Sequence, residues 1–199
     1  MVYGPVDGVM TELTYDCRNR LLRAGDNVYT YDAENVRIAV ETSSERTEIV
    51  TDSVSASLSR VLMEITYPKK NGVISTTGVT RSFVYGSGLI YEEEGTQILY
   101  HHYNNLGSTT KLTDAEGKVV ASYTYGVYGE LLSGDTTYTH YLYNGRCGVR
   151  TESNGLYYMR QRYYNTEIKR FINQDILMGD ITNAQSLNRY SYVQGNPVS

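Results

Sequence analysis

The sequence predicts an all-β protein in which short β-hairpins follow one another in an irregular repeat. Three observations support this prediction: tyrosines recur at intervals of roughly twenty residues, apolar residues alternate with period two, and turn signals separate the alternating stretches. No stretch combines the period and the length of an amphipathic helix. The best helix candidate is a short turn around residues 180–187.

The repeat is clearest in its Tyr-Asp pairs. In the stretches TYDCRNRL from Thr14 and TYDAENVRI from Thr30, the Tyr, Asp and Asn residues recur 16 positions apart. One extra residue then precedes Arg37 in the second copy. Later tyrosines continue the pattern at intervals of 18, 22 and 18 residues: Tyr85, Tyr103, Tyr125 and Tyr143. A period of this length is below that of helical solenoids and fits one β-hairpin per unit.

Each unit combines strand and turn signals. Between Val119 and Val127 the odd positions read Val, Ala, Tyr, Tyr and Val, which predicts one apolar face of a strand. Asp114 and Gly117 precede this stretch and predict a turn. In the Tyr-Asp units, we expect the tyrosine ring to stack between neighbouring units. The aspartate carboxylate is expected to accept backbone N–H groups of the following turn, and the arginine that closes the unit is expected to pair with this carboxylate.

Two acidic regions are less regular. Residues 42–59 are rich in Ser, Thr and Glu, and we expect an exposed turn followed by a further strand, with a flexible linker as the alternative. Apolar residues spaced from Val50 to Leu62 would also fit a helix. The run Glu92–Glu94 before Gly95 is most simply a solvated turn.

Composition narrows the classes of function. The 199 residues include 21 Tyr, 2 Phe and no Trp, with a net charge of −4 and a pI near 5.4. The stretch GLYYMRQRYYNTEIKRFINQD, residues 155–175, interleaves aromatic and basic residues, but this acidic balance argues against nucleic-acid binding. No signal peptide or membrane span is predicted. The sequence opens directly on repeat-like residues, which suggests a piece of a longer chain.

The ordered motifs of the chain resemble the YD-repeat proteins of the Rhs family. They are YDxxNRL, YxYDAxNxR, NNLGSTTKLTDAEGKVVASYTYGVYGELL, GLYYMRQRYY followed by RFINQD, and SLNRYSYVQGNPVS. On this resemblance, residues 1–99 are YD-type hairpin repeats, and residues 100–199 are similar to the Rhs-associated core, continuous with the repeats.

The resemblance implies a curved, spiralling sheet, of which this chain is an arc or a closing part. In polymorphic toxins and in the C components of Tc toxin complexes, the sheet forms a hollow shell around a variable C-terminal toxin; teneurins carry a similar shell. The implied function is structural: a shell fragment whose partners are the rest of the parent protein and its C-terminal toxin or effector. The parent is expected to be secreted or at the cell surface. The alternative is a cell-surface carbohydrate-binding or adhesion module that uses exposed tyrosines.

The chain departs from the family pattern at three places. Asn165-Thr166 and Asp175-Ile176 stand where the family has Asp-Pro, and Lys169 stands where it has Gly. In toxin members an aspartate pair of the core cuts the chain downstream, so Asp175 is the one position carried over as a processing aspartate. A turn-capping carboxylate is the competing interpretation for Asp175. Otherwise we expect no enzymatic activity and no cofactor.

The basic and aromatic stretch is interpreted as a structural seam that locks the terminal strands. Its members are Tyr157, Arg160, Arg162, Tyr163, Arg170 and Phe171. Arg160 and Arg162, two apart on one predicted strand, are expected to share a face and to pair with carboxylates or carbonyls inside the shell.

Metal binding and thiol chemistry find little support in the sequence. His101, His102 and His140 lack ligand spacing, and adjacent strand residues point to opposite faces, so no metal site is expected. Cys17 and Cys147 are predicted to be free or packed thiols, with a disulfide left open. Sheet edges with few prolines should let the isolated chain associate with itself.

Overall fold

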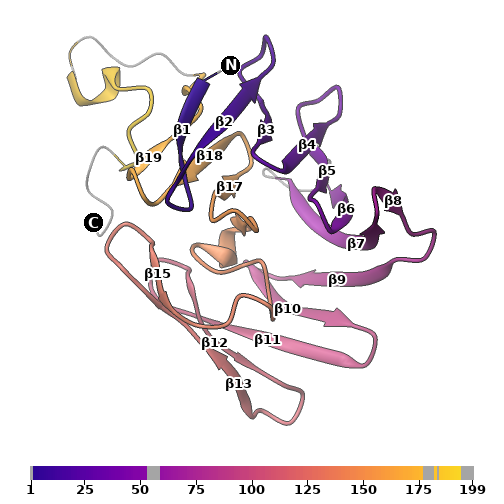
Figure 1. The fold of residues 1–199 in the computed structure, drawn as a ribbon. Coiled ribbons are helices and arrows are strands. Elements are labelled where there is room, and N and C mark those ends of the chain that lie inside the picture. Colours follow the sequence, from indigo (N-terminus) through magenta and orange to yellow (C-terminus); the bar gives the residue numbers. More distant parts are fainter. Residues whose placement is uncertain (1, 53–58, 177–181, 183, 194–199) are drawn as a thin grey trace.

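The computed structural model describes residues 2–52, 59–176, 182 and 184–193. Its main feature is a strongly curved antiparallel sheet of thirteen strands that follows the chain from residue 2 to residue 122 (Figure 1). Each strand pairs with its neighbours in sequence, except that β8 is a short side branch of β7, so that β7 pairs directly with β9. The predicted all-β class with hairpins in a curved sheet is confirmed, but the described strands after residue 122 form two separate smaller sheets rather than continuing the main one.

The strands of the main sheet, in chain order, are β1 (Val2–Val6), β2 (Val9–Tyr15), β3 (Leu21–Ala24), β4 (Asn27–Tyr31), β5 (Arg37–Glu41), β6 (Glu45–Asp52), β7 (Arg60–Lys70), β8 (Val73–Ile74), β9 (Val79–Tyr85), β10 (Leu89–Glu94), β11 (Gln97–Tyr103), β12 (Thr109–Thr113) and β13 (Val119–Ser122). Strand β11 runs across residue 99, so the sheet is continuous where the sequence resemblance changes from repeats to core.

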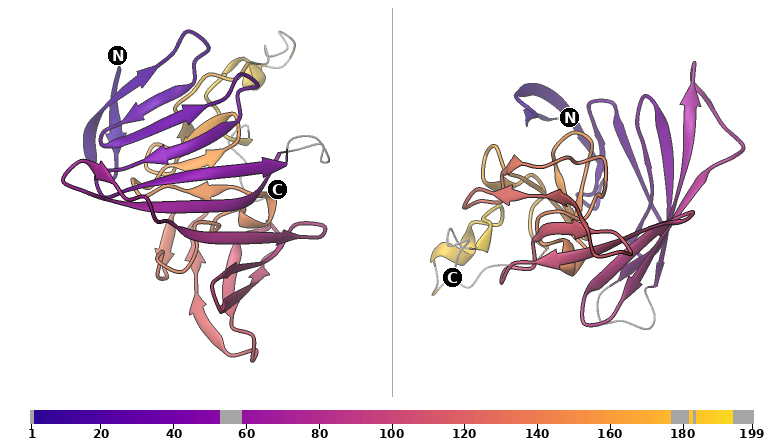
Figure 2. Two further views of the ribbon diagram at one scale, coloured as in Figure 1. Left: turned by 90° about the vertical axis from the view of Figure 1, so that its right-hand side faces the viewer. Right: turned by 90° about the horizontal axis from the view of Figure 1, so that it is seen from below.

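Shorter elements follow the main sheet. They are a hairpin of β14 (Thr124–Tyr125) and β15 (Leu131–Ser133), the 3-10 helix η1 (Gly145–Cys147), a four-stranded sheet of β16 (Arg150–Thr151), β17 (Tyr157–Met159), β18 (Arg162–Asn165) and β19 (Arg170–Phe171), and the 3-10 helix η2 (Ala184–Leu187). We call residues 138–176 the closing segment. The main sheet curves around this segment, and we call the sheet face that contacts it the inner face (Figure 2).

One five-residue turn recurs through the described part of the chain. The first N–H donates to the fifth carbonyl, and the fourth N–H donates to the first carbonyl; the turns begin at Asp16, Asp32, Asn104, Asp114, Gly126 and Glu152. The fourth residue has a positive φ in every copy, and it is always Asn or Gly, the types that adopt this conformation at least cost. In five of the six hairpins a bulge lies next to the turn, which strengthens the local twist and curves the sheet.

The predicted role of the repeat aspartates is confirmed. Asp16 Oδ1 accepts the N–H groups of Arg18 and Arg20, both at 2.9 Å, and Asp32 Oδ1 accepts that of Val36 at 2.7 Å. Arg20 closes its own turn through an ion pair to Asp16 at 2.6 Å. Arg37 does not pair with Asp32; its partner lies in the closing segment.

The repeat tyrosines join one hairpin to the next. The hydroxyls of Tyr31, Tyr103 and Tyr125 donate to the backbone carbonyls of Leu21, Leu89 and Thr109, at 2.9, 2.7 and 2.6 Å. Each acceptor is the first strand residue after a turn of an earlier hairpin. The Tyr15 hydroxyl donates instead to the carbonyl of Ile172, at 2.8 Å. The closing segment therefore supplies to Tyr15 the kind of carbonyl acceptor that an earlier hairpin supplies to Tyr31, Tyr103 and Tyr125.

Several local predictions need correction. Glu92–Glu94 belongs to strand β10 rather than to a solvated turn, and Glu92 is buried. The apolar alternation fails at its ends, because Val119 and Val127 are exposed while the residues between them alternate as predicted. The strand expected after the turn near residue 42 is β6. The helix alternative for residues 50–62 is wrong where the structure describes them. Residues 50–52 belong to β6, residue 59 adjoins β7 and residues 60–62 belong to β7, while residues 53–58 lie outside the described part of the chain. Part of the predicted turn at 180–187 is the 3-10 helix η2.

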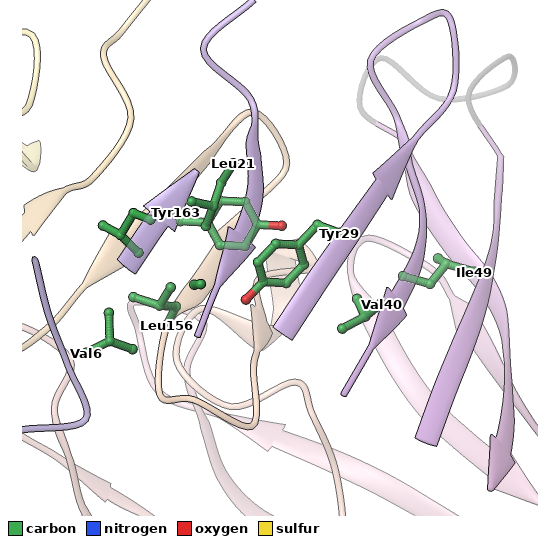
Figure 3. Packing of buried hydrophobic residues seen from close by; sticks show 9 residues of the cluster. Val6, Leu21, Tyr29, Val40, Ile49, Leu156 and Tyr163 are labelled. Atoms are coloured by element: carbon green, nitrogen blue, oxygen red, sulfur yellow. The ribbon is translucent and has the colours of Figure 1, made fainter. Parts of the chain in front are cut away.

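The largest hydrophobic core lies between the inner face and the closing segment. Seven residues of β1–β6 form it with Leu156 and Tyr163, and Tyr29 and Tyr163 meet with ring centroids 4.8 Å apart (Figure 3). A second cluster is mainly aromatic and joins Tyr192 to residues of the closing segment around Tyr164. The largest core takes its side chains from both the repeats and the closing segment, so these two parts share it.

Candidate functional site

A buried chain of charged groups joins the inner face to the closing segment. Arg37 on β5 pairs with Glu152 at 2.6 Å, and the same carboxylate accepts from Arg150 on β16 at 2.8 Å. Arg150 also pairs with Glu64 on β7 at 3.0 Å. All four side chains are at most 6% exposed. Because two cations alternate with two carboxylates, the chain is neutral overall and each charge has a partner, which is the condition for burying charges at this depth.

Tyrosines and one histidine surround these charges. The Tyr141 hydroxyl donates to Glu64 at 3.2 Å, and Arg37 donates to the Tyr163 hydroxyl at 3.1 Å. The guanidinium of Arg37 also stacks 3.7 Å from the centre of the Tyr158 ring. Although burial opposes ionisation, the neighbouring Arg150 guanidinium holds the pKa of Glu64 at about 2. Burial, together with Arg150, lowers the pKa of His140 to about 4, against an opposing influence of Glu64.

One feature of the sequence indicates that Arg37 differs from the arginine of the preceding unit. Arg20 directly follows Asn19 in the first Tyr-Asp unit, whereas the extra residue in the second unit moves Arg37 to the next position and onto the strand. Successive strand residues point to opposite faces, and Arg37 is buried where Arg20 stays partly exposed at the turn. Glu64 and Glu152 offered no comparable signal, because Arg150 lies 86 residues from Glu64 and Arg37 lies 115 residues from Glu152 in sequence.

A second polar cluster lies around Glu92, the residue expected in a solvated turn. Its carboxylate accepts from the Thr139 hydroxyl at 3.0 Å and lies 3.5 Å from Arg81. The His101 ring lies 3.6 Å from it and is fully buried, with its other nitrogen 3.3 Å from the Thr109 hydroxyl. Glu92 thus faces the closing segment from β10, much as Glu64 does from β7.

The aromatic residues of the predicted seam are all buried. Tyr157, Tyr163 and Phe171 are 3, 1 and 5% exposed. The Tyr157 hydroxyl donates to the carbonyl of Gly129 at 2.7 Å, while the Tyr163 hydroxyl meets that of Tyr31 at 3.0 Å. Neither Tyr157 nor Tyr163 presents a ring face to solvent, which removes these two rings as stacking surfaces for a sugar.

The three arginines of the seam have separate positions. Arg160 does not lie on a strand with Arg162, because residues 160 and 161 form the turn between β17 and β18, with a φ of 59° at Arg160. Arg160 donates to the carbonyls of Ser59 and Cys147 at 3.2 and 2.6 Å. Arg162 stacks 3.6 Å from the Phe171 ring centre and pairs with Asp175 at 2.8 Å. Arg170 begins β19 with its side chain exposed.

Asp175 lies at the end of the closing segment and takes part in an ion pair. Its carboxylate pairs with Arg162, its N–H donates to the carbonyl of Arg189 at 2.9 Å, and its own carbonyl accepts from the Arg189 guanidinium. This part of the chain is held against the first Tyr-Asp turn, where Asn173 Nδ2 donates to the carbonyl of Asn19 and Asn19 Nδ2 donates to the carbonyl of Gln174. The processing role of Asp175 stays a prediction.

The histidines and cysteines are apart from one another. His101 is buried and His102 is exposed, as expected for adjacent strand residues. Within the described ranges, no group of three His, Cys, Asp or Glu side chains could hold a metal ion. Cys17 and Cys147 are free and exposed, so the two are not joined by a disulfide.

His140 makes the stability of the fold depend on pH. Its pKa in the folded chain is about 4, below its ordinary value of 6.5, so the unfolded chain binds a proton first as the pH falls. Its contribution is complete above pH 6.5, and the free energy of unfolding should decrease by up to about 3 kcal/mol between pH 6.5 and 4. Urea unfolding at several pH values measures this. In a His140→Gln variant the free energy of unfolding should no longer decrease with pH above pH 4.5. If this free energy depends on pH in the same way in the variant and the unchanged protein, His140 is not the group responsible.

Lys169 stands at a position where the resemblance to Rhs-type motifs implies Gly, and its backbone has a conformation that suits Gly. Lys169 has a φ of 57°, which costs a side-chain-bearing residue about 1 kcal/mol. Its ammonium lies 4.8 Å from the Tyr128 ring centre, a contact that offsets part of this cost. We expect Lys169→Gly to raise the free energy of unfolding by up to about 1 kcal/mol. Lys111→Gly, in the middle of strand β12, should lower it by a similar amount. A loss of stability in Lys169→Gly would contradict this reading of the turn.

The fold is similar to that of solved Tc toxin structures, which places this chain with all-β proteins of curved antiparallel sheets. A crystal structure of TcdB2-TccC3 without its hypervariable C-terminal region matches 94% of this chain and 10% of that one, with a TM-score of 0.74 and 18% identity. A structure of the Photorhabdus luminescens Tc holotoxin pore also matches 94% of this chain and 10% of that one, with a TM-score of 0.72 and 18% identity.

Curated relatives extend the likeness to sequence. The chain is 28% identical over 210 residues to the tRNA3(Ser)-specific nuclease WapA of Bacillus spizizenii. It is also 28% identical over 209 residues to the tRNA nuclease WapA of Bacillus subtilis strain 168. Both alignments cover 94% of this chain but only 9% of the relative, so the chain spans about a tenth of either protein. No family model matches the chain.

Together, these relatives and structural neighbours fit the Rhs/YD-repeat toxin family at a coarse level, and the chain aligns with about a tenth of each of these larger proteins. In the described part of the chain, no helix has the length and apolar character needed to cross a membrane.

Proposed function

We propose that this chain is a wall segment of a hollow β-shell in an Rhs-type protein, and that the shell encloses a C-terminal toxin. The closing segment, in this proposal, covers the inner face of the wall and locks its hairpins in place. One observation carries the proposal: the buried charge chain and the largest core both join strands β1–β7 to residues 150–163. Such contacts hold a wall together, and none of them requires a substrate.

The sheet edges support a place within a longer wall. Strand β1 at one edge and β13 at the other each pair on one side only within the described residues. Beside the β1 edge, Val2, Tyr3, Val9 and Met10 are 55 to 65% exposed. An apolar, half-paired edge of this kind is a site for adding another strand. The parent protein, in this proposal, covers it with a further hairpin and acts outside the cell or at its surface.

Electron cryomicroscopy of a full-length protein that carries this segment tests the proposal. The expected result is a closed shell in which the sheet of residues 2–122 continues past β1 and β13 into further hairpins, with the closing segment inside. A segment displayed on the exterior of the particle, with both sheet edges open to solvent, would overturn the proposal.

The 199-residue chain alone should associate through the same edges. We expect light scattering to show a mass that rises with protein concentration, because β1 adds to an edge of another copy. Tyr3→Lys places a charge at that edge and should shift the chain toward the monomer. Leu132→Lys, an exposed change on β15, is the matched control. A strict monomer at all concentrations would contradict this expectation.

The carbohydrate-binding alternative makes a different prediction. A glycan-binding module would be a monomer that captures a defined sugar on a glycan array. The burial of Tyr157 and Tyr163 weighs against it, and we expect no glycan to be retained. Retention that is lost in Tyr157→Ala or Tyr163→Ala, with the fold intact, would favour the binding module.

A further inference from the structure

A small, partly open cavity lies where the closing segment meets the inner face. Its volume is about 30 Å³, and its walls come from strands β5, β6, β7 and β9, from β16 and from the turn between β17 and β18. A water molecule needs roughly 10–15 Å³ by this measure. The cavity can therefore hold a single small ion or one to two waters, but no organic ligand.

Positive charge dominates the walls of this cavity. Four arginines line it, Arg37, Arg60, Arg150 and Arg160, and no acidic side chain does so among the described residues. Glu152 and Glu64 pair with Arg37 and Arg150 and compensate those two charges. Arg160 donates to two backbone carbonyls, which carry no formal charge to compensate its own.

Two buried polar atoms of the lining residues have no hydrogen-bond partner. They are Nε of Arg37, whose side chain is 1% exposed, and the hydroxyl oxygen of Tyr85. The guanidinium can only donate, and the hydroxyl has a proton to donate. An unpaired buried donor costs about 1–3 kcal/mol, so two of them at one cavity call for an acceptor. A water would accept from both but would bring two protons of its own, whereas a small anion only accepts.

We propose that this cavity is a binding site for one small monovalent anion of halide size. The anion accepts from Arg37 Nε and the Tyr85 hydroxyl, and lies in the field of Arg60 and Arg160. Because β5, β9 and the β17–β18 turn all contribute to the site, an occupant stabilises the contact between the sheet and the closing segment. Chloride is the anion to test first, since it is spherical and fits the volume.

Urea unfolding of the 199-residue chain in sodium chloride or sodium gluconate, at equal ionic strength, tests the site. Gluconate is too large for the cavity. The unfolding constant should fall about tenfold in chloride once its concentration is roughly ten times the dissociation constant, and bromide should act alike. Tyr85→Phe should reduce this ratio to threefold or less, while Tyr91→Phe, on the adjacent strand β10 and outside the cavity, should retain it. Tyr85→Phe removes one oxygen and is expected to fold.

Anomalous scattering from crystals grown in sodium bromide locates the anion directly. A bromide peak within the cavity, beside Tyr85 and Arg37, is the expected result. Equal unfolding constants in chloride and gluconate, a halide effect that Tyr85→Phe leaves intact, or a cavity without an anomalous peak would each overturn the proposal in favour of water.

Discussion

Glu152→Gln should lower the free energy of unfolding by about 3–5 kcal/mol. The carboxylate of Glu152 accepts from both Arg37 and Arg150 and is fully buried. The amide keeps the shape of the side chain but removes the carboxylate that pairs with Arg37 among the described residues. A buried guanidinium without a counter-charge is costly, and breaking one partner of a buried pair typically costs this amount. Urea unfolding followed by circular dichroism measures the change.

Glu48→Gln is the matched control for this substitution. Glu48 lies 3.5 Å from Arg46 in an ion pair whose carboxylate side chain is 47% exposed. Exposed pairs contribute about 0–1 kcal/mol, so the control should change stability little. Equal effects of the two substitutions would show that the buried charge chain does not hold the closing segment.

Leu156→Ala should lower the free energy of unfolding by about 2–5 kcal/mol. Leu156 is the last residue of the turn that begins at Glu152, is 1% exposed, and packs into the core of the first six strands. Truncating a buried leucine loses its transfer free energy and leaves a cavity, because the surrounding side chains relax only in part.

Leu132→Ala provides the comparison, since Leu132 on β15 is 68% exposed. It should change stability by less than about 0.5 kcal/mol. If Leu156→Ala is as mild as this control, the closing segment contributes little to the core of the repeats.

The sequence predicted the repeating parts of this fold well, because their determinants are local. The carboxylate of Asp16 and the left-handed conformation of Asn19 act within one turn, and both recur in the next unit. Strand alternation is also local, and it predicted the buried positions between Val119 and Val127 apart from the two ends.

The site was harder to predict, because its determinants are distant in sequence. Glu92 looks like part of an acidic turn until the closing segment places Thr139 against it. Arg160 looks like a strand residue, and the positive φ of the two-residue hairpin turn is not visible from its side-chain type. The burial of Tyr157 and Tyr163 likewise depends on the sheet that curves around them, so sequence alone could not separate a wall from a binding surface.

Native-state hydrogen exchange tests most directly whether the repeats and the closing segment form one structural unit. The slowest amides of β17 and β18 should open with the same free energy as those of β4 and β5, and Glu152→Gln should lower both values equally. Exchange of β17 and β18 through a separate opening of lower free energy, with β4 and β5 unaffected by Glu152→Gln, would contradict a shared core.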